Sequence, residues 1–330
     1  MFGRINAIEY GFNGDGITKN DAVMKKYIEN DYTTPIFFPT GSYVFAEGFN
    51  FPDQCYIELE ANAELKLDGD EIQEYFITLR RGRTGGGYTF NSFIRGGFIN
   101  ANNKAKNGIG VYKTRHCVFE NFILKNVLEK GIVTRTEKIP DGHAFFRNIL
   151  VENDFGIKGT TGIFDNAFDT HFEEVEVVNF ETGFYTICGR FCRCSAWLRD
   201  NSIVENSTFA FIDGYDIVFE SPAVDTYRYG FRIDRPGYSV GISNMLWITN
   251  GGVYTKELRD KFDATIFNAA SDECIYNVCG LKINHEENLS FSNIPLPSSS
   301  FLNLRYPKTF NPYEEYKNFR DDTEALKKNM

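Results

Sequence analysis

The chain has 330 residues, of which 42% are hydrophobic and 24% are charged, a balance typical of globular proteins. Its formal net charge of −10 argues against general nucleic-acid binding, because contacts with phosphates require local positive charge. No apolar run reaches the length of a membrane span, and the first residues (MFGRINAIE) lack the basic and apolar regions of a secretory signal.

The N-terminal residues predict a strand, a helix and two further strands. Residues 8–18 (IEYGFNGDGIT) indicate a strand that ends in a glycine-rich turn, after which Thr18 is expected to cap a helix with Asp21 near its start. Two short strands then surround a turn in residues 36–45 (IFFPTGSYVF). The helix has apolar residues at i,i+4 positions, which predicts one buried face. These residues are Val23, Met24, Tyr27 and Ile28.

This order of motifs resembles the N-terminal cap of the right-handed parallel β-helices of the pectate-lyase superfamily, which includes phage tailspike depolymerases and epimerases. The resemblance covers about residues 5–67 and rests on the Gly-Asp-Gly turn at 14–16, the short helix, and the Pro-x-Gly-x-Tyr motif at 39–43. It implies that the helix plugs the open end of a solenoid. Asp15 is expected to serve the turn through hydrogen bonds. The chain departs from the family at residues 18–21 (TKND), where a more acidic run is usual.

Farther along, a short phrase recurs at a nearly constant interval. It stands at 119–126 (FENFILKN), 146–153 (FRNILVEN) and 172–179 (FEEVEVVN), with steps of 146−119 = 27 and 172−146 = 26. Apolar residues two or three apart indicate strands with a corner, and the closing Asn suits a left-handed turn. Such a period predicts stacked coils, with many of the 32 phenylalanines in interior columns. Further copies are predicted to begin at Ile94, Ile242 and Ile275.

We therefore predict an all-β protein with three parts. Residues 1–50 form the N-terminal cap with its capping helix, residues 51–290 form the parallel β-helix, and residues 291–330 form a C-terminal tail that ends in a helix from Asn311. Residues 80–90 (RRGRTGGGYTF) lack the Lys-Ser/Thr ending of a phosphate loop. This basic loop either grips an acidic sugar or a neighbouring subunit, or is simply solvated.

The seven cysteines favour reduced, largely buried thiols over a metal site. Cys192-x-Cys194, with Cys188 nearby, hints at a metal, but a second pair at the usual spacing is missing. The sequence indicates no cofactor and leaves open a divalent cation such as Ca²⁺.

Alignment of the repeated phrases places polar residues in one column, three positions before each leading apolar residue. If the register holds, His116, His143 and Asp169 lie on consecutive coils, with Asp141 and Asp165 just upstream. A carboxylate beside a histidine orients the ring and raises its pKa, as acid–base catalysis requires. These five residues are the candidate catalytic group. The alternative is a structural polar ladder at a corner.

One position after the leading residue, Glu120, Arg147 and Glu173 predict a surface ion-pair ladder.

A second candidate group lies in residues 188–240, a stretch that we expect to be less regular and rich in loops. Arginine binds carboxylates with two parallel donors, and tryptophan offers a flat face to a sugar. The stretch also contains carboxylates such as Asp200 and Asp213 that a glycoside hydrolase would need. The candidate substrate-binding residues are Arg190, Arg193, Trp197, Arg199, Arg228 and Arg232.

These observations favour a carbohydrate-active protein that cleaves a long acidic or bacterial-surface polysaccharide as a lyase or a hydrolase. The alternative is a non-catalytic β-helix that serves as a spike, receptor-binding or scaffold subunit. The chain lacks the Asp-Asp and Gly-His-Gly set of polygalacturonase-like hydrolases and the Trp-x-Asp-His phrase of pectate lyases. The resemblance to tailspikes further implies a homotrimer and action outside the cell as a virion or surface component.

Overall fold

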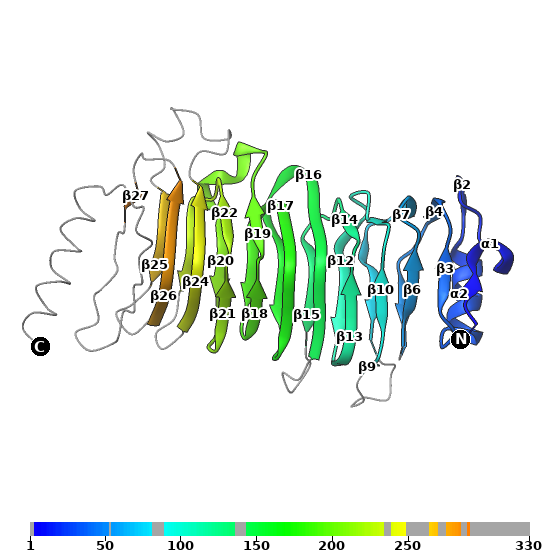
Figure 1. Ribbon diagram of the computed structural model, residues 1–330. Helices are drawn as coiled ribbons and strands as arrows, with labels where there is room; N and C mark the ends of the chain where they lie inside the picture. Colours follow the sequence, from blue (N-terminus) through cyan, green and yellow to red (C-terminus); the bar gives the residue numbers. More distant parts are fainter. Residues whose placement is uncertain are drawn as a thin grey trace, which may run out of the picture.

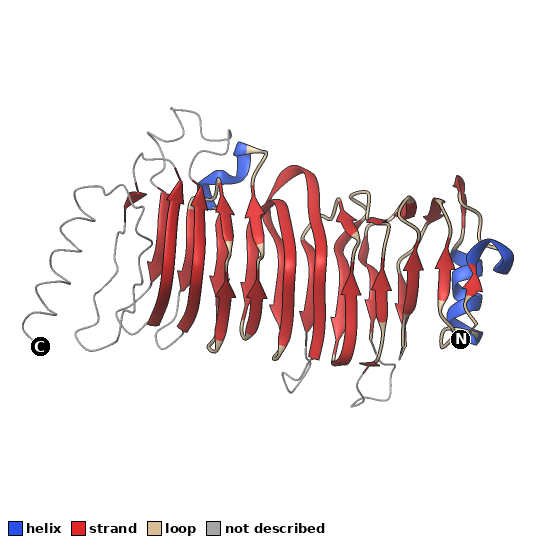
Figure 2. Ribbon diagram, viewed as in Figure 1, coloured by secondary structure: helices blue, strands red, loops and turns tan. Residues whose placement is uncertain are grey.

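The computed structural model describes residues 3–290, apart from residues 53, 81–88, 136–142, 234–238, 249–263, 270–274 and 285–288. In this part of the chain, strands pair in parallel with the corresponding strands one coil before and one coil after (Figures 1 and 2). The coils therefore stack into a parallel β-helix with three sheets along its length. We call them the first, second and third sheets, in the order in which each coil passes through them.

Each of the three sheets contains a series of short strands. The first sheet contains β1 (Ile5–Asn6), β3 (Ile36–Phe38), β6 (Tyr56–Leu59), β10 (Phe93–Arg95), β13 (Thr114–Glu120), β18 (Gly189–Cys192) and β21 (Ile217–Glu220), and β9 (Thr89–Phe90) pairs with the start of β13. The second contains β2 (Asp15–Lys19), β4 (Gly41–Phe45), β7 (Ala63–Leu67), β11 (Phe98–Asn100), β14 (Ile123–Lys125), β19 (Ser195–Trp197) and β22 (Ala223–Asp225). The third contains β5 (Phe49–Phe51), β8 (Gln73–Leu79), β12 (Ala105–Tyr112), β15 (Lys130–Arg135), β20 (Thr208–Ile212), β23 (Tyr229–Ile233), β25 (Ala264–Ala269) and β27 (Leu289–Ser290). Longer strands bend from sheet to sheet, namely β16 (His143–Asn166), β17 (Thr170–Thr186), β24 (Ser239–Ile248) and β26 (Ile275–Asn284).

The helices of the described residues are short, and none is long and apolar enough to cross a membrane. They are α1 (Ala7–Tyr10), α2 (Asp21–Asn30) and the 3₁₀ helix η1 (Asn201–Asn206). The first two lie at the N-terminal end of the stack (Figure 1). Met24 and Tyr27 of α2 are fully buried, and Val23 and Ile28 pack against the core, so the predicted apolar face is confirmed. The strand predicted to begin at Ile8 is wrong at its start, because Asn6 caps the one-turn helix α1 there and the strand β2 begins only at Asp15.

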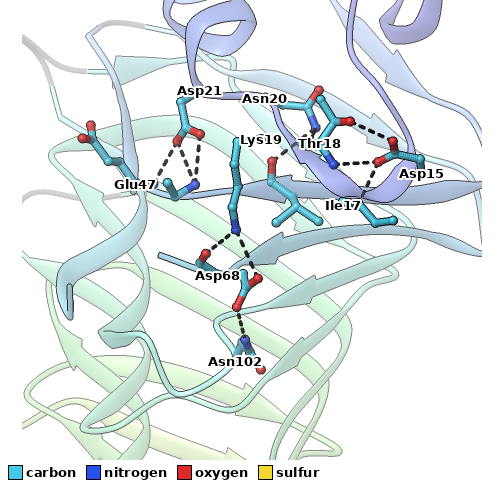
Figure 3. A network of polar contacts seen from close by, with 11 residues as sticks. Asp15, Ile17, Thr18, Lys19, Asn20, Asp21, Glu47, Asp68 and Asn102 are labelled. Atoms are coloured by element: carbon cyan, nitrogen blue, oxygen red, sulfur yellow. Dashed lines mark hydrogen bonds and ion pairs between the residues drawn. The ribbon is translucent and has the colours of Figure 1, made fainter. Parts of the chain in front are cut away.

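The glycine-rich turn before α2 is held by one carboxylate. Asp15 accepts hydrogen bonds of 2.8 Å from the backbone N–H groups of Ile17 and Thr18 and from the Thr18 hydroxyl (Figure 3). The structural role predicted for Asp15 is therefore confirmed. Thr18 does not cap the helix as predicted, because α2 begins at Asp21 and its N-cap position is Asn20, whose side chain makes no capping hydrogen bond.

A second carboxylate ties α2 to the neighbouring coil. Asp21 accepts hydrogen bonds from the backbone N–H groups of Ala46 and Glu47, which follow β4 (Figure 3). The two glycine motifs also pack on each other, since a Cβ atom on Gly41 would lie 2.9 Å from the carbonyl oxygen of Gly14. The motifs that carried the family resemblance are therefore contact points between the first coils.

Phenylalanine rings form a continuous column inside the first sheet. Neighbouring rings are nearly parallel, with centroid separations of 4.8, 4.8, 4.8 and 4.4 Å. The column consists of Phe119, Phe146, Phe172, Phe191 and Phe219. The predicted register of the three clearest repeats is confirmed, because Phe119 lies opposite Phe146 and Phe146 opposite Phe172.

The later repeats differ from the prediction in register and regularity. Phe191 lies opposite Phe172, only 191−172 = 19 residues later, so this short coil escaped a search for a period near 26. The predicted copy that begins at Ile275 is shifted, since Val278 lies opposite Ile242. Residues 189–233 also continue the three-sheet pattern rather than becoming irregular, and η1 is their main interruption.

A column of glycines narrows the interior where the third sheet faces the second. A Cβ atom on Gly131 would lie 2.4 Å from Val151, and one on Gly162 would lie 2.2 Å from Val177. Such distances are too short for any side chain, so the glycines allow the two sheets to touch. The predicted helix from Asn311, residues 81–88 of the basic loop, and Asp141 lie outside the described residues.

Candidate functional site

The outer surface of the first sheet carries a hollow of about 330 Å³. Side chains alternate between the two faces of a strand, so the residue directly before each stacked phenylalanine points outward. These residues lie in register on successive coils and form the outer column. The outer column consists of Val118, Phe145, His171, Arg190 and Val218. The first four line the hollow together with Phe146, Arg147, Phe172, Glu173 and Cys192.

Two rings form the centre of the hollow. The rings of Phe145 and His171 are stacked with centroids 4.9 Å apart and planes at 19°. Phe145 is 45% exposed and is, with Phe155, one of two phenylalanines among the described residues with a large exposed surface. On its other side, the outer column continues with the short side chain of Val118, and Phe145 as a whole stays partly exposed. The hollow thus offers a flat apolar surface to a ligand.

The surroundings of His171 favour its neutral form. Burial lowers its pKa below the ordinary value, and the positive charge of Arg190 and the neighbouring His143 act in the same direction, while Asp169 opposes them. A neutral imidazole has a free nitrogen lone pair at neutral pH. His171 can therefore accept a proton in the hollow.

The cation beside His171 is available to a ligand. Arg190 is exposed, and among the residues that the structure describes it has no ion-pair partner. The neighbouring arginines differ, because Arg147 pairs with Glu120 at 2.5 Å, and Arg193 pairs with Glu173 and Glu174 at 2.5 and 2.9 Å. The predicted ion-pair ladder is confirmed for Glu120 and Arg147. Glu173 pairs with Arg193 instead of Arg147, which neutralises a residue predicted to bind substrate.

The predicted catalytic column is only partly assembled. His143 Nε2 and Asp169 Oδ2 lie 4.0 Å apart at the edge of the first sheet, and both side chains are substantially exposed. His116 does not continue this row, because the strand bulges between Arg115 and Cys117 and Arg115 lies opposite His143. The bulge leaves His116 exposed in a left-handed conformation with φ 57°. This extra residue is what the sequence alignment could not detect.

Asp165 is an interior residue, which corrects its place in the candidate catalytic group. Its side chain is 0% exposed and accepts hydrogen bonds from the hydroxyls of Thr134, Thr170 and Thr186 at 2.5, 2.7 and 3.1 Å. Burial raises the pKa of Asp165 to about 7, although the three hydroxyls act to lower it. A carboxyl enclosed in this way holds adjacent coils together and cannot reach a polysaccharide.

The other predicted substrate-binding residues lie on different sides of the coil. Trp197 is at the end of β19 in the second sheet, with the Arg199 guanidinium 4.6 Å from its ring centroid and its indole N–H bonded to Glu176. Arg228 and Arg232 belong to the third sheet or its approach, where they stack on aromatic rings at 4.9 and 5.5 Å. Since each coil passes through every sheet, residues 190–232 surround the axis and form no single site.

Sequence reasoning missed Phe145 and His171, although a usable signal was present. Both stand immediately before a leading phenylalanine, in the same position as Arg190 before Phe191. An alignment at this offset brings Phe145 and His171 together, whereas Arg190 joins them only once the short coil to Phe191 is known. The cysteine pair suggested for a metal is divided, since Cys192 lines the hollow while Cys194 is buried inside the coil. Among the described residues, no group of three or more His, Cys, Asp or Glu side chains is arranged to hold a metal ion.

The fold resembles solved structures of enzymes that act on polysaccharides. No model of a protein family matches the chain, and no curated protein matches it in sequence. An alginate lyase from Paenibacillus sp. str. FPU-7 superposes with a TM-score of 0.59 and 12% identity, over 81% of this chain and 94% of the lyase. An endo-xylogalacturonan hydrolase from Aspergillus tubingensis gives a TM-score of 0.54 and 14% identity, over 82% of this chain and 90% of the hydrolase. An exopolygalacturonase from Thermotoga maritima gives 0.53 and 10%, over 84% and 79%. The chain has the right-handed β-helix fold of the pectate-lyase-like proteins, as the sequence resemblance predicted.

Proposed function

We propose that this protein binds an acidic polysaccharide along the outer face of its first sheet and cleaves it by β-elimination. One observation carries the proposal: His171, whose surroundings favour the neutral form, lies between the partly exposed ring of Phe145 and the unpaired cation Arg190 in one hollow. A base next to a carboxylate-binding cation is the pair of groups that β-elimination at a uronate requires.

The reaction would begin with Arg190 binding the carboxylate of a uronate residue, which makes the neighbouring C5 proton more acidic. The lone pair of His171 takes this proton. The electrons of the C5–H bond form a C4=C5 double bond, and the C4–O bond to the preceding sugar breaks. The imidazolium then returns its proton to the leaving oxygen. His171 is thus regenerated, and no further reactant is consumed.

Phe145 would supply the binding surface for the sugar ring, because the C–H groups of a pyranose pack well on an aromatic face. Hydrolysis fits the hollow less well, since it needs a pair of carboxyl groups, one on each side of the bond that is cleaved. Among the described residues that line the hollow, Glu173 is the only acidic one, and it is paired with Arg193. The similarity to an alginate lyase agrees with elimination, although that similarity is one of fold.

The decisive experiment replaces His171 by Gln and measures unsaturated products by their ultraviolet absorbance. Alginate, polygalacturonate and a neutral glucan are the substrates. We expect wild type to act on a uronate polymer and H171Q to be at least ~100-fold slower, because a general base typically contributes that much. The activity should rise with pH as His171 loses its proton, with a midpoint below the ordinary histidine value.

The matched control is His116→Gln, which changes an exposed histidine outside the hollow and should leave the rate unchanged. An H171Q protein that cleaves as fast as wild type would refute the role of His171. If wild type binds uronate polymers but releases no product from any of them, the protein is a non-catalytic spike or scaffold subunit.

We also propose the assembly that the family resemblance implies. In it, α2 closes the N-terminal end of the solenoid within residues 1–50, residues 51–290 carry the binding surface, and residues 291–330 form a tail. The whole would work as a homotrimer in a virion or on a cell surface. Light scattering that gives the monomer mass of 37.8 kDa at micromolar concentration would refute the trimer.

A further inference from the structure

The hollow on the first sheet is longer along the axis of the β-helix than across it. Along the axis, its lining takes one outer-column residue from each of four consecutive coils, Val118 to Arg190. The rings packed inside these coils show that this distance is three steps of 4.8 Å. Across the strands, the lining adds only the outward residues two positions later, about 7 Å away. These residues are Arg147, Glu173 and Cys192.

The outer column continues toward the N-terminal end of the stack with two aromatic residues. Phe93 lies opposite Val118 on the preceding coil, and Tyr56 lies opposite Phe93. Both are partly exposed, whereas the next residue of each strand is buried, so both side chains point outward. Their ring centroids are 5.3 Å apart with planes at 55°. The Arg95 guanidinium lies 4.8 Å from the centroid of the Phe93 ring and pairs with Glu58, which fixes one side of the ring.

In the opposite direction, the outer column ends on a low surface. Val218 lies opposite Arg190 and is 44% exposed. Gly241 follows on the next coil, where the atoms nearest to an added Cβ would be 3.8 Å away or farther. The column therefore carries no obstructing side chain immediately beyond Val218.

The spacing of the coils suits an extended sugar polymer that runs along the axis. A 1,4-linked pyranose chain advances by close to one coil spacing per sugar, so successive rings would lie over successive coils. A chain across the strands would instead leave the outer column and pass over polar residues on both sides. On one side are His143 and Asp169, and on the other are Arg147 and Glu173, which belong to ion pairs.

We propose that the acidic polysaccharide lies parallel to the axis, along the outer column and its extension to Tyr56, with Phe93 as a remote binding subsite. The nature of the ligand and the place of cleavage at His171 and Arg190 rest on the proposed function. The direction of the chain rests on the register and on the shape of the hollow. Five coils carry the column from Phe93 to Arg190. A trimer therefore fits within the hollow, whereas a hexamer also reaches Phe93.

The test compares trimers and hexamers of mannuronate and of galacturonate by calorimetry. The protein carries His171→Gln so that cleavage does not disturb the measurement. We expect the hexamer to bind more tightly than the trimer. Adding Phe93→Ala should weaken hexamer binding ~5-fold, through loss of an aromatic contact, and should leave trimer binding unchanged.

The matched control is Phe98→Ala, which removes a partly exposed phenylalanine from the second sheet on the same coil and should change neither affinity. Unchanged trimer binding also shows that the F93A protein is folded. If F93A is unstable, Phe93→Leu keeps an apolar side chain without the ring and should show the same selective loss.

The outcomes separate this inference from the proposed function. If F93A binds the hexamer as tightly as the F98A control, or if the hexamer binds no more tightly than the trimer, the inference is wrong. If His143→Gln weakens hexamer binding and F93A does not, the chain crosses the strands, so the inference fails while the proposed function stands. If F93A has the selective effect but protein with His171 intact releases no unsaturated product, the binding track stands and the proposed cleavage fails. If neither oligomer binds, both are wrong.

Discussion

The two faces of the first sheet follow different rules although they are built from the same strands. The inner face repeats phenylalanine on five consecutive coils, with rings stacked at 4.4 to 4.8 Å. At the adjacent outward positions, the outer column has valine, phenylalanine, histidine, arginine and valine. Interior positions must fill a fixed space, whereas outward positions are limited mainly by solubility. Repetition therefore identifies the scaffold, and departure from repetition identifies a candidate site.

The sharpest test of this contrast exchanges an inner and an outer phenylalanine for alanine. Phe172→Ala should lower the free energy of unfolding by about 3–5 kcal/mol, because it leaves a large cavity in the ring column. Phe145→Ala should cost less than about 1 kcal/mol, since its ring is 45% exposed, yet it should weaken binding of uronate oligomers. Urea unfolding and calorimetry measure the two effects. Equal losses of stability would show that the two faces do not differ as described.

The buried carboxyl of Asp165 gives a second test, through the pH dependence of the free energy of unfolding. Because the pKa of Asp165 is about 7 in the folded protein and near 3.8 when unfolded, the folded protein holds an extra proton between these values. This contribution to stability is complete below about pH 4 and is lost as the pH rises through 7. Asp165→Asn cannot lose a proton. The stability of wild type relative to D165N should therefore fall by roughly 2 kcal/mol between pH 5 and pH 8.

Urea unfolding of both proteins at each pH measures this difference, and the comparison cancels the titration of other groups. A constant difference across the range would mean that Asp165 stays ionised inside the coil. Thr186→Val removes the hydroxyl donor that lies farthest from Asp165. If Asp165 stays ionised, this change should affect the stability of wild type and D165N differently, because only wild type carries the charge that the hydroxyl binds.

The smallest effect is expected in the outer ion-pair ladder. Glu120→Gln removes the partner of Arg147, whose side chain is 57% exposed. The free energy of unfolding should fall by about 0.5 kcal/mol or less, since water and salt screen such pairs. The difference should vanish in high salt. A loss above about 2 kcal/mol, independent of salt, would place the ladder among the elements that hold the coils together.

The sequence predicted the scaffold well where the spacing of apolar residues reports burial directly. Phe119, Phe146 and Phe172 have the register expected from steps of 27 and 26. The turn role of Asp15 was also predictable, because a short carboxylate side chain in a glycine-rich turn bonds its own backbone. The lengths of the turns were not predictable, since they depend on contacts between coils. The step of 19 to Phe191 therefore broke the pattern.

The candidate site was predicted less well for the same reason. A single extra residue near His116 changed its neighbours, and no local signal in residues 115–117 announces the bulge. The burial of Asp165 depends on three threonines from three separate parts of the chain, and a sequence pattern cannot show where such hydroxyls converge. Arg190, which was selected by residue type alone, lines the hollow. Its partners His171 and Phe145 became evident only from the register of the strands.

The glycine column has a mechanical consequence for the rod. Gly131 and Gly162 bring the third sheet into direct contact with Val151 and Val177 of the second. At the level of these glycines there is no space left between the second and third sheets. Lateral compression of the β-helix is therefore resisted by repulsion between atoms in contact instead of by bending of the sheets. The interior can thus neither flatten under load nor open into an axial passage. The outer surface above these coils therefore keeps its shape under lateral load.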